Sequence, residues 1–256
     1  MKLARIKHES LTAPRYAFID GDAVYPLNEG DWFDGFKPPS GTPSIPLAEI
    51  SLLAPVVPSK IVCVGRNYIE HAVELGNKMP DEPLLFLKAP SAVVGTGENI
   101  ELPEASHQVE HEGELGVVIA KRAREISDDE DPLSYVLGYT CVNDVTARDL
   151  QRKDIQFTRA KSFDTFCPVG PWVEPQLDPA NTVVTTRVNG QVKQQGRTAD
   201  MAFSVSFLLR YISRIMTLYP GDLIVTGTPA GVSRLYQGDS VEVEVDGVGV
   251  LSNKVL

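Results

Sequence analysis

The chain has 256 residues, of which 43% are hydrophobic and 23% charged, so it can build a sizeable core and is not a disordered polyelectrolyte. Its formal net charge of -10 disfavours nucleic acid as a partner, because two polyanions repel each other. An acidic enzyme that acts on carboxylates needs a local positive centre, which a bound cation with a few arginines and lysines would supply.

The first 57 residues are expected to form a small β unit. A hairpin is predicted over residues 16–25, where Gly21 lies in the turn between two short runs of β-forming residues. The prolines within residues 52–58 disfavour a helix and indicate a linker. We therefore predict a small N-terminal β domain over residues 1–57 and a larger domain over residues 58–256.

The larger part begins with short strands around one short helix. Strands are predicted over residues 61–65 and 83–88, each rich in apolar residues. Between them, residues 67–75 favour a helix, with Asn67 as its N-cap. Residues 115–120 form a run that is apolar on both faces, which is typical of a strand in the centre of a sheet.

The C-terminal third contains the clearest helical pattern. Apolar residues recur at helical spacing from Ser204 to Met216, which predicts an amphipathic helix. Further strands are predicted over residues 240–245 and 249–255. Because strands outnumber helices and no regular βαβ alternation occurs, the sequence predicts a β-rich α+β fold and not a doubly wound sheet.

The cysteines and the hydrophobic runs indicate a cellular location. Three cysteines, Cys63, Cys141 and Cys167, lie far apart in the chain, which is typical of free buried thiols in a reducing compartment. The first residues are interrupted by charges, and no apolar run is long enough for a membrane span. We therefore expect a cytoplasmic protein with no membrane partner.

A run of carboxylates over residues 109–115 is the most informative segment. If this segment is extended, Glu110, Glu112 and Glu114 project from one face. Three like charges on one side of a strand repel each other, and a hard divalent cation with a preference for oxygen ligands would compensate them.

The alternative is an ordinary solvated strand face. Glu242 and Glu244 have the same spacing but alternate with valines, a pattern that indicates charges in water above an apolar face. Around Glu112 the opposite face carries His111 and Gly113 instead of an apolar row. The residue pattern alone leaves the metal site and the solvated face as equal alternatives.

A cation would need a third ligand, for which Asp144 is the candidate. Asp144 follows an apolar stretch, and Arg148 and Gln151 would share its face of a helix. The alternative is that Asp144 is an N-cap with Arg148 as its salt-bridge partner one turn later. The pattern does not separate these two roles.

A family likeness rests on six segments in a fixed order. They are VGRNYIEHAVE (64–74), PLLFLKAPSAVVG (83–95), VEHEGELGVVI (109–119), NDVTARDLQ (143–151), AKSFDTFCPVGPW (160–172) and TLYPGDLIVTGTPAGV (217–232). With these segments the chain resembles the fumarylacetoacetate hydrolase family, in particular its acylpyruvase, oxaloacetate decarboxylase and hydroxyheptadienedioate isomerase branch. The resemblance covers most of residues 60–256.

The resemblance implies a fold, a cofactor and a set of functional residues. The fold is the rolled mixed β-sheet of the family's C-terminal domain, in a homodimer, and the cofactor is Mg²⁺ or Mn²⁺. By position, the family's metal ligands fall on Glu112, Glu114 and Asp144, its catalytic pair on His71 and Glu74, its catalytic and substrate-binding lysine on Lys161, and its other substrate contacts on Arg148, Gln151 and Thr228.

These assignments predict a hydrolase or lyase that acts on 2-oxo dicarboxylic acids or acylpyruvates. It would cleave the C3–C4 bond through a metal-stabilised pyruvate enolate, by acylpyruvate hydrolysis or oxaloacetate decarboxylation. In hydrolysis His71 would activate water, with Glu74 orienting its ring. Without the resemblance, the same two residues would be interpreted as an incidental pair on an exposed helix face.

Two other functions stay open at this point. The first is an isomerase of 2-hydroxyhepta-2,4-diene-1,7-dioate in aromatic catabolism, which would move a proton at the same site without breaking a carbon–carbon bond. The second is a catalytically silent module that binds a metal or a metabolite.

Overall fold

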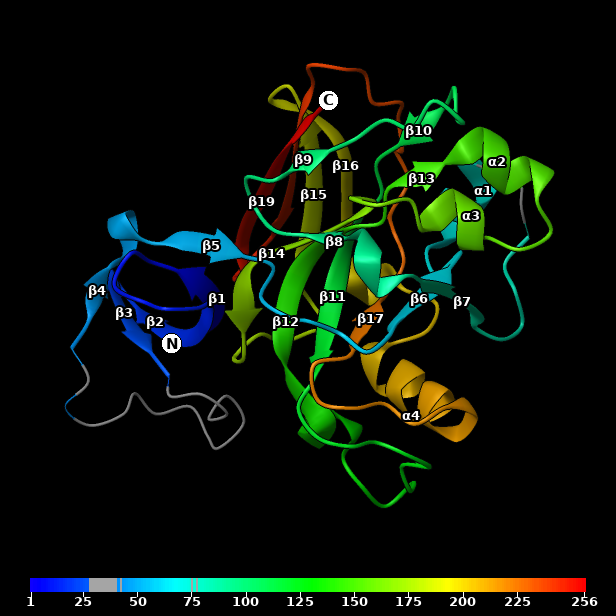
Figure 1. Cartoon of the computed structure of the whole chain (residues 1–256). Helices are drawn as coiled ribbons and strands as arrows, with labels where there is room; N and C mark the ends of the chain where they lie inside the picture. Colours follow the sequence, from blue (N-terminus) through cyan, green and yellow to red (C-terminus); the bar gives the residue numbers. More distant parts are fainter. Residues whose placement is uncertain (28–40, 42, 75, 77) are drawn as a thin grey trace.

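The computed structural model describes residues 1–27, 41, 43–74, 76 and 78–256 (Figure 1). Strands far outnumber helices in it, which confirms the predicted β-rich α+β class. Most strands belong to one large sheet, in the order β4-β3-β2-β1-β14-β12-β11-β17-β6-β7, and a second sheet has the order β16-β15-β18-β19-β9.

The N-terminal residues form an antiparallel sheet of short strands. Their bounds are β1 (Lys2–Lys7), β2 (Arg15–Asp20), β3 (Ala23–Pro26), β4 (Ile45–Pro46) and β5 (Ser51–Leu53). Strands β2 and β3 pair as the predicted hairpin, with Gly21 in the left-handed conformation (φ 58°) that its turn requires. Strand β1 also pairs with β14, Leu3 opposite Val173, so the large sheet continues through both parts of the chain. The division of the chain at residue 57 stays a prediction.

Strand β11 lies in the interior of the large sheet. The other strands of this region are β6 (Ile61–Gly65), β7 (Leu84–Lys88), β8 (Val93–Val94), β11 (Gly113–Ile119), β12 (Val136–Asn143), β14 (Cys167–Glu174) and β17 (Leu223–Val225). All seven residues of β11 are buried, between β12 on one side and β17 on the other, which confirms the predicted central strand. A Cβ atom on Gly116 would lie 2.6 Å from Cγ2 of Val142, so only glycine fits this tightly packed position.

The second sheet packs against the large one. It consists of β9 (Asn99–Ile100), β15 (Val183–Val188), β16 (Gln191–Arg197), β18 (Ser240–Val245) and β19 (Gly249–Val255). Val243 and Leu251 from this sheet join Leu115 of β11 in one hydrophobic cluster. On β18 the valines are buried, whereas Glu242 and Glu244 are half-exposed, as predicted for a solvated strand face. A third, minor pair consists of β10 (Val109–Glu110) and β13 (Thr146–Ala147).

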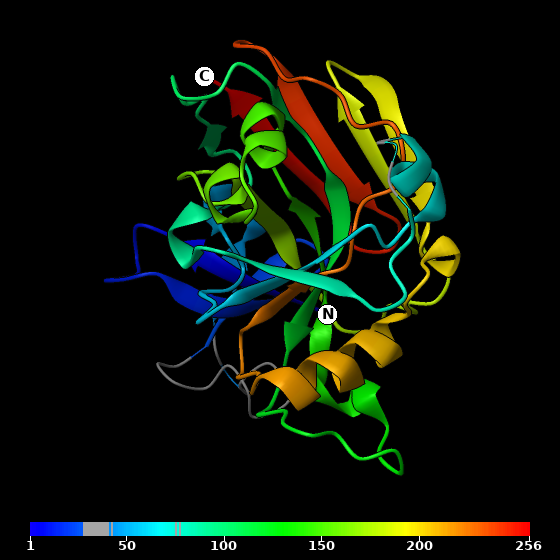
Figure 2. The ribbon, with the colours of Figure 1, turned by 90° about the vertical axis from the view of Figure 1, so that its right-hand side faces the viewer.

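Helices are few and short. They are α1 (Ile69–Glu74), α2 (Arg148–Lys153), α3 (Thr158–Lys161) and α4 (Val205–Ile215), with 3-10 turns at Leu47–Glu49, Pro90–Ala92, Pro132–Tyr135 and Thr198–Asp200. The helix predicted from Ser204 is confirmed as α4. Ser204 is its N-cap, and the Ser204 hydroxyl accepts a hydrogen bond from the Phe207 amide. In the side view of Figure 2, α1 lies to one side of strands β6, β7 and β11, and α2 and α3 lie to the other. Within the described ranges, no helix is long and apolar enough to cross a membrane.

The predicted N-cap of the first helix is wrong. The helix begins at Ile69, and the Asn67 side chain turns away from it to bridge two other segments. Its amide nitrogen donates to the carbonyls of Phe203 and Thr226, and its oxygen accepts from the Phe203 amide. Because these hydrogen bonds satisfy both the nitrogen and the oxygen of the Asn67 side chain, Asn67 connects the end of β6 to two other segments and does not cap α1. Leu75, the predicted last residue of the helix, lies outside the described residues.

Candidate metal centre and active site

Three buried carboxylates meet where β11 pairs with β12. Glu112 lies in the break between β10 and β11, Glu114 lies on β11, and Asp144 follows the last residue of β12. The antiparallel register places Gly113 opposite Asn143, so the strand end that carries both glutamates lies beside the strand end that leads into Asp144. One oxygen from each carboxylate lies within 4.8 Å of the other two, a spacing at which the three could hold a metal ion.

Two buried lysines lie against this cluster. The Nζ atom of Lys161 is 2.6 Å from Oε2 of Glu112 and 2.6 Å from Oδ2 of Asp144. The Nζ atom of Lys88 is 2.6 Å from Oδ1 of Asp144. The sequence analysis missed Lys88, although a lysine at the end of the apolar run of β7 is a visible signal: a charged side chain in a buried strand needs a buried partner.

Each of the three guanidinium nitrogens of Arg148 donates a hydrogen bond. Its Nε donates to Glu110 at 2.7 Å, one terminal nitrogen donates to Gln151 at 2.6 Å, and the other donates to Glu112. Helix α2 begins at Arg148 itself, and the residue at its N-cap is Ala147. The alternative role of Asp144, as an N-cap paired with Arg148, is therefore wrong.

The charges in the cluster are unevenly compensated. Burial alone would raise the pKa of Glu112, but Lys161 and Arg148 outweigh burial and hold this pKa below its usual value. Burial raises the pKa of Glu114 well above its usual value, and the charges of Asp144 and Glu112 raise it further. The carboxylate of Glu114 accepts a hydrogen bond from the Gly227 amide. A divalent cation fits this donor set, since among the described residues the Glu114 carboxylate is hydrogen-bonded only to that backbone amide, and the ion would supply the missing positive charge.

A histidine and a glutamate of α1 complete the other side of the site. The Nδ1 atom of His71 lies 3.1 Å from Oε2 of Glu74, and Oε1 of Glu74 accepts a hydrogen bond of 3.0 Å from the Gly231 amide. Only 5% of His71 is exposed, so its ring does not lie on an exposed helix face, although Glu74 is exposed. The contact with Gly231 fixes the carboxylate that orients the ring.

Thr228 is held by a buried chain of hydrogen bonds that the sequence did not reveal. Its hydroxyl donates to the Gly113 carbonyl at 2.9 Å and accepts from Nε2 of Gln194 at 2.7 Å. The amide oxygen of Gln194 in turn lies 3.0 Å from Nδ1 of His111, whose Nε2 lies 2.8 Å from the Ser233 hydroxyl. His111, to which the sequence analysis assigned no function, is completely buried.

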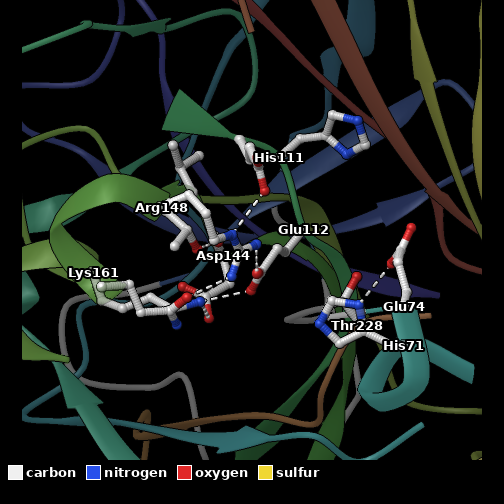
Figure 3. Close-up of polar contacts among 12 residues, drawn as sticks. His71, Glu74, His111, Glu112, Asp144, Arg148, Lys161 and Thr228 are labelled. Carbon is white, nitrogen blue, oxygen red and sulfur yellow. Dashed lines mark hydrogen bonds and ion pairs between the residues drawn. The ribbon is translucent and has the colours of Figure 1, made fainter. Parts of the chain in front are cut away.

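All nine residues that the resemblance singled out line one cavity of about 450 Å³. Figure 3 shows Arg148, Lys161 and Asp144 around Glu112, with Thr228, His71 and Glu74 on the other side of the site. The remaining wall is partly apolar, with Leu84, Phe86 and Phe157, and the cavity also contains Arg66 and Arg152. The structure thus brings the predicted residues together, and their individual roles stay predictions.

The chain belongs to the fumarylacetoacetate hydrolase family. The model of the fumarylacetoacetate (FAA) hydrolase C-terminal domain matches residues 60–256, and an Rv2993c-like N-terminal model matches residues 1–55. Members of this family are hydrolases, isomerases or decarboxylases, and they generally use a divalent metal. The chain is therefore an enzyme, and the catalytically silent alternative is set aside.

Three relatives have names that bear on the chemistry. The oxaloacetate tautomerase YisK of Bacillus subtilis is 40% identical and is matched over 93% of this chain and 87% of its own length. The solved 5-carboxymethyl-2-hydroxymuconate delta-isomerase of Mycobacterium smegmatis is 40% identical, with a TM-score of 0.91 over 100% of this chain and 99% of that one. A maleylpyruvate hydrolase from Sphingobium sp. SYK-6, solved with manganese(II) and pyruvate, is 31% identical, with a TM-score of 0.81 over 100% and 99%.

Proposed function

We propose that this enzyme moves a proton at C3 of a 2-oxo dicarboxylic acid, so that the keto and enol forms interconvert, as in oxaloacetate tautomerisation. The observation that carries the proposal is the His71–Glu74 pair, which is fixed by Gly231 and opens into the cavity that the three carboxylates also line. The names of the relatives at 40% identity, a tautomerase and an isomerase, support a proton shift over bond cleavage.

The carboxylates would hold the cofactor. Glu112, Glu114 and Asp144 offer only oxygen ligands, which suit Mg²⁺ and Mn²⁺ alike. When bound, the ion would polarise the 2-oxo group and favour negative charge on its oxygen. Lys161 and Arg148 would then keep Glu112 ionised and in place. Lys161 and Gln151 also reach the cavity, where they would contact the carboxylate at C1.

The proton shift itself is assigned to His71. With the ring proton on Nδ1, shared with Glu74, the Nε2 atom is an unprotonated base. Nε2 would take the proton from C3, the C3–H electron pair would become the C2–C3 double bond, and the π electron pair of the C2 carbonyl would move onto its oxygen. The protonated Nε2 would then give its proton to that oxygen, which completes the enol and returns His71 to its starting protonation state. The same steps in reverse give the keto form.

Purified full-length chain with Mg²⁺ or Mn²⁺ and freshly dissolved enol-oxaloacetate tests this proposal. Loss of the ultraviolet absorbance of the enol should accelerate, while pyruvate, measured with a coupled lactate dehydrogenase, should not form. Activity that survives both a chelator and Glu114→Ala would refute the metal-dependent reaction. No acceleration with any 2-oxo dicarboxylic acid would refute the proposed function.

A second candidate is cleavage of the C3–C4 bond, which the sequence analysis placed first. The name of the maleylpyruvate hydrolase, and the same basic nitrogen of His71, which could activate water, favour it. Release of pyruvate from an acylpyruvate such as fumarylpyruvate, or from oxaloacetate, would identify this reaction in the same assay. A spectral shift of 2-hydroxyhepta-2,4-diene-1,7-dioate without cleavage would instead identify the isomerase.

We also propose that the enzyme acts as a cytoplasmic homodimer, as the family resemblance implies. Ile69 and Val73 on α1 and Phe207 on α4 are exposed apolar side chains that would suit a contact between two copies. Sedimentation equilibrium at several concentrations would detect the dimer. A monomer under all conditions would contradict it.

A further inference from the structure

Arg66 is a charged side chain in the cavity wall that makes no hydrogen bond or ion pair with any described residue. It is half-buried at the end of β6. In contrast to Arg66, the cavity cations Arg148 and Lys161 both form ion pairs with carboxylates of the metal centre. Arg66 is therefore available to an anionic ligand.

A rigid turn holds Arg66 at this place. Its backbone is in the left-handed region, with φ at 58°, which is uncommon for a residue other than glycine. The next residue, Asn67, bonds to both backbone groups of Phe203 and to the carbonyl of Thr226, at 2.7 to 3.0 Å. Such conformations persist where the surrounding contacts fix them, and they concentrate at functional sites.

This turn lies near Glu114, which forms no ion pair with a side chain in the described part of the chain. Gly227 connects the turn to the metal centre: its amide donates to Glu114, and a Cβ atom added to it would lie 2.7 Å from Cβ of Asn67. Lys161 and Arg148 contact Glu112 instead. The paired cations therefore lie beside Glu112, whereas the turn that carries Arg66 lies near Glu114.

The charge of the cavity suits a doubly negative ligand. Its lining contains four carboxylates and four side-chain cations, which cancel when all are ionised. A bound divalent cation would leave two positive charges in excess, although the whole chain carries a net charge of -10. A 2-oxo monocarboxylate would neutralise one of these charges, and a 2-oxo dicarboxylate would neutralise both.

The lining also offers a surface for the carbon chain between two carboxylates. Phe86 and Phe157 pack edge to face, with ring centroids 5.6 Å apart, and both line the cavity with Leu84. An apolar wall between polar ends is typical of a site that holds a ligand with a charge at each end.

We propose that Arg66 binds the distal carboxylate of a 2-oxo dicarboxylic acid whose 2-oxo end lies at Glu112, Glu114 and Asp144. This subsite rests on the proposed function, because it presumes that a 2-oxo acid is held at the metal centre. An arginine at this position selects the dianionic substrate over its monoanionic analogue, since only the former fills the subsite with a charge-assisted hydrogen bond.

Equilibrium binding to the Mn²⁺-loaded protein tests the subsite without turnover. The ligands are matched pairs that differ only in the distal group: 2-oxoglutarate with 2-oxopentanoate, and 2-oxoadipate with 2-oxohexanoate. We expect wild-type protein to prefer the dicarboxylate of at least one pair by about 10- to 100-fold, the worth of one charged hydrogen bond. Arg66→Gln should abolish this preference and leave the affinity for the monocarboxylates unchanged. The control is Arg124→Gln, which removes an exposed arginine outside the cavity.

The outcomes separate the subsite from the proposed function. If wild-type protein binds the 2-oxo acids but Arg66→Gln weakens both members of a pair equally, or neither, the assignment of Arg66 is wrong. If Arg152→Gln removes the preference and Arg66→Gln does not, the subsite belongs to Arg152, which also lines the cavity. If no 2-oxo acid binds in the presence of Mn²⁺, both the proposed function and the subsite are refuted. Metal-dependent stabilisation, with circular dichroism spectra, shows whether each variant is folded.

Discussion

The ammonium group of Lys88 lies 2.6 Å from Oδ1 of Asp144, and at most 2% of either residue is exposed. Lys88 also donates to the carbonyl of Val145 at 3.2 Å. Lys88, at the end of β7, thus neutralises the negative charge of Asp144, a predicted metal ligand. A buried carboxylate of this kind is costly to leave without a counter-charge.

Lys88→Met should therefore destabilise the metal-free protein, by about 3 kcal/mol, the lower end for breaking a buried ion pair, because Lys161 still contacts Asp144. Added Mn²⁺ should recover part of this loss, because a cation at the site compensates the same carboxylate. Urea unfolding with and without Mn²⁺ measures both effects. The control is Lys60→Met, which breaks the Lys60–Asp222 pair outside the metal centre and should show no recovery beyond that of wild type.

The metal ligands can be tested against a matched pair of glutamates. Glu114→Gln should abolish the stabilisation by Mn²⁺, which for wild type at 100 times the dissociation constant amounts to about 2.7 kcal/mol. Glu242→Gln changes a half-exposed glutamate with the same spacing in a strand and should leave the stabilisation intact. Thermal melting at increasing Mn²⁺ concentrations measures the difference. Equal stabilisation of wild type and Glu114→Gln would show that the ion binds elsewhere.

Removal of the proposed base should affect turnover and not metal binding. His71→Gln should lower kcat by about 100- to 10,000-fold, the usual contribution of general acid–base catalysis. Its Mn²⁺ affinity, measured by calorimetry, should stay close to that of wild type. Glu70→Gln, an exposed neighbour on the same helix, is the control and should keep full activity. A fall in kcat of less than threefold for His71→Gln would exclude His71 as the base.

Gln194 is predicted to act through Thr228. Gln194→Met removes the donor to the Thr228 hydroxyl and should lower kcat/KM by about 3- to 10-fold, the range for one hydrogen bond. In a double-mutant cycle with Thr228→Val the two losses should not add, because both variants remove the same contact. Gln195→Met, at the exposed neighbouring position, is the control. Additive losses would mean that Gln194 acts on the site by another route.

Local patterns in the sequence were sufficient for the regular elements. Three patterns of residues close in the chain each predicted the observed element. They are the β-forming runs on either side of Gly21, the apolar periodicity after Ser204 and the two-sided apolar run at Leu115. Asn67 is the exception. Its side chain is satisfied by Phe203 and Thr226, which lie more than a hundred residues away, so a local capping rule could not anticipate its partners.

The candidate site shows the same limit. Spacing alone could not separate Glu112 and Glu114 from Glu242 and Glu244, because the difference lies in burial and in the contact of Glu112 with Lys161. Six ordered motifs supplied the residues that the pattern left open. Neither source pointed to His111 or Gln194, since their partners come from different strands and meet only in the folded chain.

Gly113 lies between two of the predicted metal ligands and is also where the two sheets touch the site. Its amide donates to Gln194 of the second sheet, and a Cβ atom on it would lie 2.0 Å from the Thr186 hydroxyl of that sheet. If the three carboxylates were grafted onto another β-hairpin, the ligands would be transferred without the second sheet, which packs against Gly113 between them. The smallest transplantable unit of this centre is a pair of sheets, with a glycine where they meet.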